Sequence, residues 1–204
     1  MILLATAVED ELRFWQHRDD VRVLITGIGP VEASAAVAAA LARHPYELVV
    51  NAGIAGIFNG AARIGDGVVV AEDAMELNLE GGAELTLPQG ATVVSSARSD
   101  ATLVNRLRDR GFAALRGITV AHVTCSEATA RRLAERGAQV ESMEGFAVLR
   151  AAERAGVAAI ELRGISNRCG VRHDSGWDFA AGIIGLERVL EALFNARREI
   201  EGKS

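Results

Sequence analysis

Short apolar runs alternate with amphipathic helical patterns along most of this 204-residue chain. Seven runs are typical of strands: residues 2–7, 21–26, 47–51, 68–71, 91–95, 118–123 and 158–165. Five segments between or after them are typical of helices: residues 31–43, 100–110, 127–136, 143–155 and 179–198. Strands that alternate with helices in this way predict a mostly parallel sheet covered by helices on both faces.

The section from residue 66 to 95 holds strands without a helix between them, so part of the sheet is expected to be antiparallel. The sequence therefore predicts an α/β fold of three layers (α/β/α) around a mixed, mostly parallel central sheet. Half of the residues are hydrophobic, and we see no internal repeat or low-complexity linker. We expect one domain over residues 1–204.

Composition excludes several classes of function. The net charge of −5 argues against binding to nucleic-acid backbones, which requires a basic face. Lys203 is the only lysine, which excludes Schiff-base chemistry and P-loop phosphate binding inside a site. Cys125, Cys169 and the four histidines lack the spacing of a metal site, and the cysteines are interpreted as small buried hydrophobes. We expect neither a metal nor another cofactor.

The chain start lacks the positive segment of a signal peptide. The longest uncharged stretch, residues 33–42, covers about half a membrane span. We therefore expect a soluble cytoplasmic protein that does not bind membranes.

Polar residues gather where one predicted helix and one predicted strand meet. Glu144 stands at the start of the helix over 143–155, and the apolar run 157–165 ends in Ser166-Asn167-Arg168. A helix that leads into a buried strand with a polar C-terminal end is how α/β proteins build a ligand crevice.

Two glycine-rich turns follow other predicted strands. Residues 26–30 read Thr-Gly-Ile-Gly-Pro, and residues 51–56 read Asn-Ala-Gly-Ile-Ala-Gly. The first is not the dinucleotide-binding motif GxGxxG, because the pattern that starts at Gly27 would need a glycine where Glu32 stands. Each is either a tight connection or a place where a ligand approaches the backbone closely.

Together with the opening segment 1–12, these blocks occur in the order of the purine nucleoside phosphorylase and nucleosidase superfamily. The chain resembles this superfamily and, within it, the futalosine hydrolases. The resemblance implies the nucleoside phosphorylase fold and hydrolysis of the N-glycosidic bond of futalosine. Hypoxanthine is then released, as a step of menaquinone biosynthesis. It also implies a homo-oligomer, a dimer or larger, whose partner molecule is a purine nucleoside.

The acidic run Glu9-Asp10-Glu11 follows the first strand. Glu9 and Asp10 are interpreted as residues that favour a helix N-terminus. The resemblance implies that Glu11 is the glutamate that activates water. Phosphorylases carry a Gly-Asp-Pro start and a phosphate-binding arginine here, which this chain lacks, so water is the expected nucleophile.

The resemblance also implies a ribose site. Met143 would pack under the ribose and Glu144 would bind its 2′- and 3′-hydroxyls, with Gly53 and Ile54 beside them. Because Ile54 stands where many relatives have a hydroxyl residue, it would contact the substrate through backbone or apolar surface. Glu144 could instead only stabilise a helix that Ser142 caps. Glu141 is interpreted as structural.

Asn167 stands where nucleosidases for adenine nucleosides have a protonating aspartate. Its amide can donate a hydrogen bond to N7 or O6, the two acceptors of a 6-oxopurine, and so favours a hypoxanthine-like base. An asparagine chosen for turn geometry is the alternative interpretation.

Arg172, His173, Trp177 and Phe179 form a polar and aromatic cluster beyond the last predicted strand. They either anchor a loop or cover the 5′ substituent of the substrate, where Arg172 or His173 would meet a carboxylate. The resemblance implies a benzoate there.

Three other functions stay open. The nearest is a nucleosidase for methylthioadenosine, S-adenosylhomocysteine or aminofutalosine on the same fold. The others are a purine nucleoside phosphorylase and a nucleoside-binding protein without catalysis, and Glu11 with Glu144 argues against the last.

Overall fold

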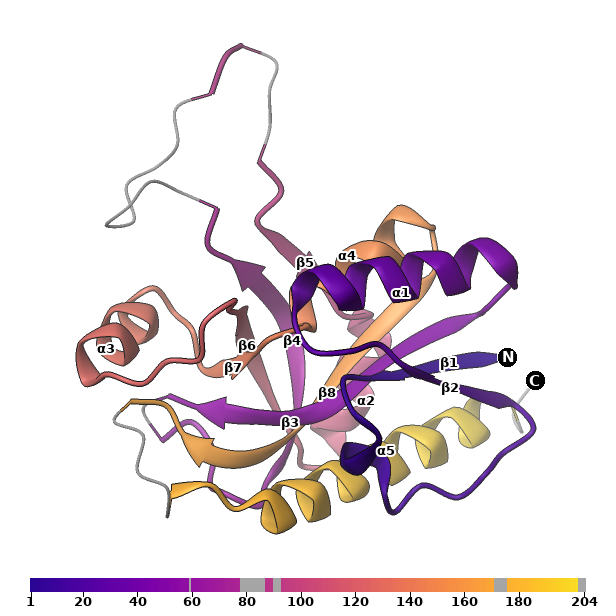
Figure 1. Cartoon of the computed structure of the whole chain (residues 1–204). Helices are drawn as coiled ribbons and strands as arrows, with labels where there is room; N and C mark the ends of the chain where they lie inside the picture. Colours follow the sequence, from indigo (N-terminus) through magenta and orange to yellow (C-terminus); the bar gives the residue numbers. More distant parts are fainter. Residues whose placement is uncertain (59, 78–86, 90–92, 171–175, 202–204) are drawn as a thin grey trace.

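The computed structural model describes residues 1–58, 60–77, 87–89, 93–170 and 176–201, in which helices flank one sheet (Figure 1). The strands are β1 (Ile2–Thr6), β2 (Val21–Ile25), β3 (Leu48–Ile57), β4 (Gly67–Met75), β5 (Ser96–Arg98), β6 (Ala113–Thr119), β7 (Val140–Ser142) and β8 (Ala158–Arg168). The helices are α1 (Pro30–Arg43), α2 (Ala101–Asp109), α3 (Glu127–Glu135), α4 (Gly145–Arg154) and α5 (Phe179–Glu201), with the short 3-10 helix η1 (Glu9–Leu12).

The strand order is β2-β1-β3-β7-β6-β4-β5, and β8 pairs with both β3 and β4. Strands β3, β7, β6, β4 and β8 therefore close into a ring, which β1 and β2 extend on one side and β5 on the other. The β1–β2, β1–β3, β3–β8, β4–β6 and β6–β7 pairs are parallel. The β3–β7, β4–β5 and β4–β8 pairs are antiparallel. The predicted mixed, mostly parallel sheet is confirmed.

Helices cover both faces of the sheet, as the three-layer prediction requires (Figure 1). Leu107 of α2 and Leu190 of α5 pack into one apolar cluster, while Val37 of α1 and Leu149 of α4 pack into another. Full burial of such a side chain contributes about 1.5–3 kcal/mol. None of the described helices has both the length and the apolar character needed to cross a bilayer.

Two strands were predicted at the wrong place. The strand expected over 118–123 is β6, which begins earlier because Gly111, at φ +88°, ends the turn after α2 and extended chain follows. Polar Arg116 lies exposed inside β6 and interrupts the apolar run that would have marked it. The strand expected over 91–95 is β5, and residues 91 and 92 lie outside the described residues. β5 is antiparallel to β4, which confirms the predicted antiparallel part.

The strands that carry the site are longer than predicted. β3 continues to Ile57 and β8 to Arg168, because Asn167 pairs with Gly56 and Arg168 with Ile57. The expected polar loop 166–168 is therefore the end of β8. β7 was not predicted, since its three residues were read as the approach to α4. It pairs with the end of β3 and sets the start of α4 beside it.

Candidate active site

A pocket opens where β3 and β8 end, beside η1 and the junction of β7 and α4. Glu11, Glu144 and Asn167 come from different elements, yet all three line it. They meet because parallel strands of an α/β sheet end at the same edge, where their loops form a crevice. Across the described ranges, no three histidine, cysteine, aspartate or glutamate side chains gather as a metal site would require.

Four donors hold the buried Glu11 carboxylate. Oε2 accepts hydrogen bonds from the Thr6 hydroxyl (2.8 Å) and from the N–H groups of Ala7 (3.2 Å) and Val8 (3.4 Å). Oε1 accepts one from the N–H of Ile54 (2.9 Å). The turn of η1 directs this residue inward, while the other two members of the acidic run stay exposed. The carboxylate is thus fixed in one orientation at the pocket.

Gly53 and Ile54 act on the pocket in different ways. A Cβ atom at Gly53 would lie 2.5 Å from Nη1 of Arg163 and 2.8 Å from Oε1 of Glu11. Only glycine therefore lets both charged groups approach β3. Gly53 lies behind the Glu11 carboxylate, whereas the half-buried Ile54 side chain lines the pocket.

Glu144 is the N-cap residue of α4, but its side chain points to the pocket instead of capping the helix. Its Oε1 accepts a hydrogen bond from the N–H of Gly29, at 2.8 Å. Burial raises the pKa of Glu144, and the charge of Arg163 and this N–H oppose the rise. Ser142 was suggested as the N-cap and is instead the last residue of β7, although its hydroxyl accepts from the N–H of Gly145 (3.2 Å).

The Asn167 amide has a defined orientation. Its Oδ1 accepts a hydrogen bond from the Ser166 hydroxyl (2.9 Å), and its Nδ2 donates to the Arg168 carbonyl (3.3 Å). A flipped amide would set two acceptor oxygens against each other at Arg168, which supports this assignment. Gly56 makes room, since a Cβ there would come within 3.2 Å of Nδ2. One of the two amide hydrogens is left for a ligand.

Other predicted contacts are distributed around the pocket. Met143 is half-buried and lines it between β7 and α4. Trp177 and Phe179 also line it, with ring centroids 5.1 Å apart and planes tilted by 37°. Arg172 and His173 lie outside the described residues.

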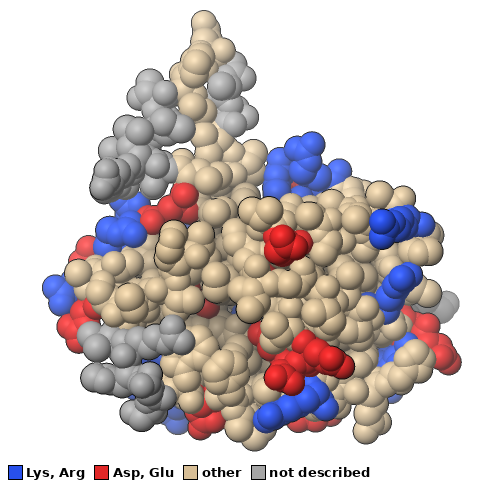
Figure 2. All heavy atoms as spheres, in the orientation of Figure 1, with Lys and Arg blue, Asp and Glu red and all other residues tan. Residues whose placement is uncertain are grey.

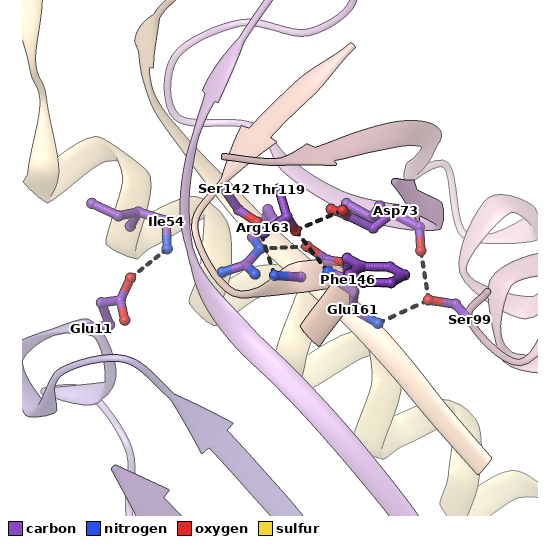
Figure 3. A network of polar contacts seen from close by, with 11 residues as sticks. Glu11, Ile54, Asp73, Ser99, Thr119, Ser142, Phe146, Glu161 and Arg163 are labelled. Carbon is purple, nitrogen blue, oxygen red and sulfur yellow. Dashed lines mark hydrogen bonds and ion pairs between the residues drawn. The ribbon is translucent and has the colours of Figure 1, made fainter. Parts of the chain in front are cut away.

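A network of buried charged residues lies next to the pocket, and it was not predicted from the sequence (Figure 3). Arg163 is 2% exposed, and its Nε donates to Oε1 of the fully buried Glu161 at 2.8 Å. Asp73 of β4 is also fully buried and accepts a hydrogen bond from the Thr119 hydroxyl at 2.7 Å. Charged residues two positions apart in a strand point to the same face. Glu161 and Arg163 inside an otherwise apolar run could have signalled the network.

Glu141 was interpreted as structural and lines the pocket from β7. Its Oε1 accepts a hydrogen bond from the N–H of Thr124 at 3.0 Å, and its Oε2 accepts one from the Thr124 hydroxyl. Burial raises the pKa of Glu141, and these two bonds oppose the rise.

The fold and the site define an α/β protein of the nucleoside phosphorylase type. Residues 7–198 match the sequence profile of the family described as "Phosphorylase superfamily", and the chain belongs to it. The futalosine hydrolase of Thermus thermophilus is 37% identical over 180 residues, 83% of this chain and 79% of that protein. The futalosine hydrolase of Acidothermus cellulolyticus is 39% identical over 189 residues, 87% of this chain and 77% of that protein. Within the superfamily, the chain belongs to the futalosine hydrolase family.

A solved structure agrees with this fold. The 5′-methylthioadenosine/S-adenosylhomocysteine nucleosidase of Helicobacter pylori, in complex with butyl-thio-DADMe-Immucillin-A, superposes with a TM-score of 0.83 at 15% identity. The match covers 95% of this chain and 97% of the other. The predicted resemblance and the predicted fold class are both confirmed.

Proposed function

We propose that this chain hydrolyses the N-glycosidic bond of futalosine and releases hypoxanthine. The observation that carries the proposal is the meeting of Glu11, Glu144 and Asn167 at one pocket, in a member of the futalosine hydrolase family. A base for water, an acceptor for a ribose diol and a donor for a purine are the groups this reaction needs.

Glu11 activates the water. General-base assistance of this kind is worth typically about 10²–10⁴-fold in rate. Three of the four donors meet Oε2 and only the N–H of Ile54 meets Oε1. Because each carboxylate oxygen offers about two acceptor positions, Oε1 keeps one for the water. Bond cleavage passes through an oxocarbenium-like state, as in glycoside hydrolysis.

Glu144 binds the 2′- and 3′-hydroxyls of the ribose. A carboxylate forms charge-assisted hydrogen bonds with hydroxyl donors, and the N–H of Gly29 holds one of its oxygens in place. Met143 and Ile54 supply apolar surface for the sugar, and Trp177, which also lines the pocket, is proposed to contact the 5′ substituent. Arg172 is proposed to meet the carboxylate of that substituent.

Asn167 favours a 6-oxopurine over a 6-aminopurine. Its Oδ1 faces the Ser166 hydroxyl, and its Nδ2 keeps one N–H to offer the ligand. N7 and O6 of hypoxanthine are acceptors, whereas the amino group of adenine is a donor. Hydrogen bonding to the departing base stabilises the charge that develops on it. This favours futalosine over methylthioadenosine, S-adenosylhomocysteine and aminofutalosine.

Water rather than phosphate is the proposed nucleophile. None of the described residues that line the pocket is a lysine or an arginine. Phosphate sites rely on such cations or on helix N-termini, and Arg163, whose Nη1 reaches Gly53 beside Glu11, is not among the residues that line the pocket.

The molecule is proposed to work as a homo-oligomer in the cytoplasm, in menaquinone biosynthesis. Ile28, which lines the pocket, and Val31 of α1 keep 61% and 77% of their surface exposed. Figure 2 shows that most of the face that carries α1 is uncharged, with a small acidic patch near its middle and further charged side chains towards its rim. A second copy of the chain would bury this apolar surface, and light scattering of the purified protein tests its mass.

Hydrolysis of a panel of nucleosides tests the function. Futalosine, aminofutalosine, methylthioadenosine and inosine are incubated with the protein, with and without phosphate, and the released base is identified. We expect hypoxanthine from futalosine at a rate that does not depend on phosphate. Phosphate-dependent cleavage would identify a phosphorylase, faster release of adenine would favour the rival nucleosidase, and no turnover would favour a binding protein.

A further inference from the structure

Arg163 lies at the centre of the buried charges next to the pocket. Among the described residues, the groups that face it are Glu11 of η1, Glu144 at the start of α4, Glu161 of β8 and, through Glu161, Asp73 of β4. Its Nη1 approaches the same point beside β3 as Oε1 of Glu11. Its Nη2 is buried and has no hydrogen-bond partner within the described part of the chain. The guanidinium therefore depends on Glu161, which its Nε contacts at 2.8 Å, for its orientation.

Two carboxyl groups meet at the first residue of α4. A Cβ atom at Gly145 would lie 2.4 Å from Oδ2 of Asp73 and 2.5 and 2.7 Å from the two oxygens of Glu161. Oδ2 of Asp73 and Oε2 of Glu161 are both buried without a hydrogen-bond donor in the described ranges. Two carboxylates in one buried site repel each other, which favours protonation of one of them.

Hydrogen bonds assign that proton to a single atom. The Thr119 hydroxyl accepts the N–H of Phe146 at 2.7 Å, so its own hydrogen is free to donate to Oδ1 of Asp73, also at 2.7 Å (Figure 3). Oδ1 is thus occupied as an acceptor, which leaves Oδ2 to carry the proton. Oδ2 is the atom that faces Glu161 at Gly145. Burial raises the pKa of Glu161, but the Arg163 guanidinium, whose Nε contacts Oε1 at 2.8 Å, opposes the rise and favours the charged form, so Asp73 is assigned the proton.

We propose that Glu161 is a positioning residue, which holds the Arg163 guanidinium towards Glu11 and Glu144 while a proton on Asp73 joins the two buried carboxyls. This rests on the proposed function of Glu11 and Glu144. Glu161 does not line the pocket. Because Glu161 pairs with Arg163, the guanidinium charge stabilises Glu161 as well as Glu11 and Glu144, the two carboxylates that line the pocket.

Removal of the negative charge of Glu161 tests whether this residue shares the Arg163 charge with Glu11 and Glu144. In Glu161→Gln, the amide oxygen still accepts from Nε of Arg163, but the guanidinium charge now acts on Glu11 and Glu144 alone. We measure kcat/KM for futalosine as a function of pH. We expect the acid limb of this profile, where activity falls as pH is lowered, to move to lower pH. Glu161→Leu removes the orienting bond as well and should lower kcat/KM roughly tenfold to a hundredfold. The matched control is Glu153→Gln, which removes an exposed carboxylate of α4 that pairs with Arg150 and should leave the limb in place.

A purely structural role would lower the thermal midpoint without moving the acid limb. An acid limb that is unchanged in Glu161→Gln, or moved to higher pH, would overturn the proposal. Absence of turnover by the wild-type protein would instead refute the proposed function.

Infrared spectroscopy at pH 7 tests the proton without turnover. We expect the wild-type protein to show a carboxylic-acid carbonyl band that Asp73→Asn removes. Asparagine should preserve the fold, because its Nδ2 donates to Glu161 as the acid does. If the band is missing from the wild type or persists in the variant, the shared proton is refuted.

Discussion

Replacement of Glu11 by glutamine tests the site most directly, because the donors around the carboxylate fix what the new amide must face. Three donors meet Oε2, and the N–H of Ile54 meets Oε1. A glutamine with its oxygen at the Oε2 position places its NH2 group against the N–H of Ile54. The reverse orientation opposes three donors. The variant therefore leaves at least one buried donor unpaired, which costs about 1–3 kcal/mol.

This loss is small beside the expected loss of activity. For a chain of this size it lowers the thermal midpoint by roughly 2–12 °C, so Glu11→Gln should still fold. An amide cannot accept a proton from water, and kcat should fall by about 10²–10⁴-fold. KM should change much less, because Glu144 and Asn167, the proposed contacts of the ribose and the base, are unchanged.

The assay follows hypoxanthine release from futalosine by Glu11→Gln, with thermal melting of the same sample. Glu9→Gln is the matched control: it makes the same change two residues away, at an exposed side chain. We expect the control to match the wild type in rate and in thermal midpoint. Hydrolysis by Glu11→Gln within a factor of a few of the wild type would remove Glu11 from the mechanism.

Three further changes have defined outcomes. Glu144→Gln should weaken turnover of ribonucleosides more than of 2′-deoxynucleosides, since only the former lose the charge-assisted bond to the 2′-hydroxyl; equal losses in kcat/KM would contradict the role. Asn167→Asp should narrow or invert the preference for futalosine over aminofutalosine, by about tenfold to a hundredfold, and an unchanged ratio would place base selection elsewhere. Burial, with the charge of Glu161, raises the pKa of Asp73 well above its ordinary 3.8, so its favourable contribution to stability is present at low pH and is lost as pH rises. Asp73→Asn should therefore gain stability relative to the wild type above about pH 4, which urea unfolding at several pH values measures; parallel curves would refute it.

Periodicity predicted most of the fold because most strands here are buried and apolar. It failed where strands are short or polar. β7 has three residues, and β5 reads Ser-Ala-Arg. Such strands exist because neighbouring strands offer them unpaired edges, β3 and β6 for β7 and β4 for β5. A local sequence pattern cannot predict such a strand, because the edge with which it pairs belongs to a segment distant in the sequence.

The pocket residues were accessible from the sequence for a different reason. Asn167 stands at the polar end of an apolar run, and Glu144 stands at the start of a predicted helix. The roles of Glu11 and Glu144 were predicted from the resemblance to the superfamily. Arg163 lies inside such a run, and its position reflects contacts with residues from other elements. Its charge is an exception to the apolar pattern of β8, and the tertiary structure makes it the common neighbour of Glu11, Glu144 and Glu161.

The charge balance of this cluster connects the buried network to the chemistry. An N-glycosidic bond breaks through a state with positive charge on the ribose, which the intact nucleoside lacks. Glu11, Glu144 and Glu161 outnumber Arg163, the cation that faces them in the described part of the chain, so the ionised cluster is net negative. A developing cation offsets that excess, and the transition state is stabilised more than the substrate. The proton on Asp73 removes one further negative charge, and Glu161 holds the Arg163 guanidinium in place. The carboxylates of Glu11, Glu144 and Glu161 can therefore stay close together before positive charge forms on the ribose.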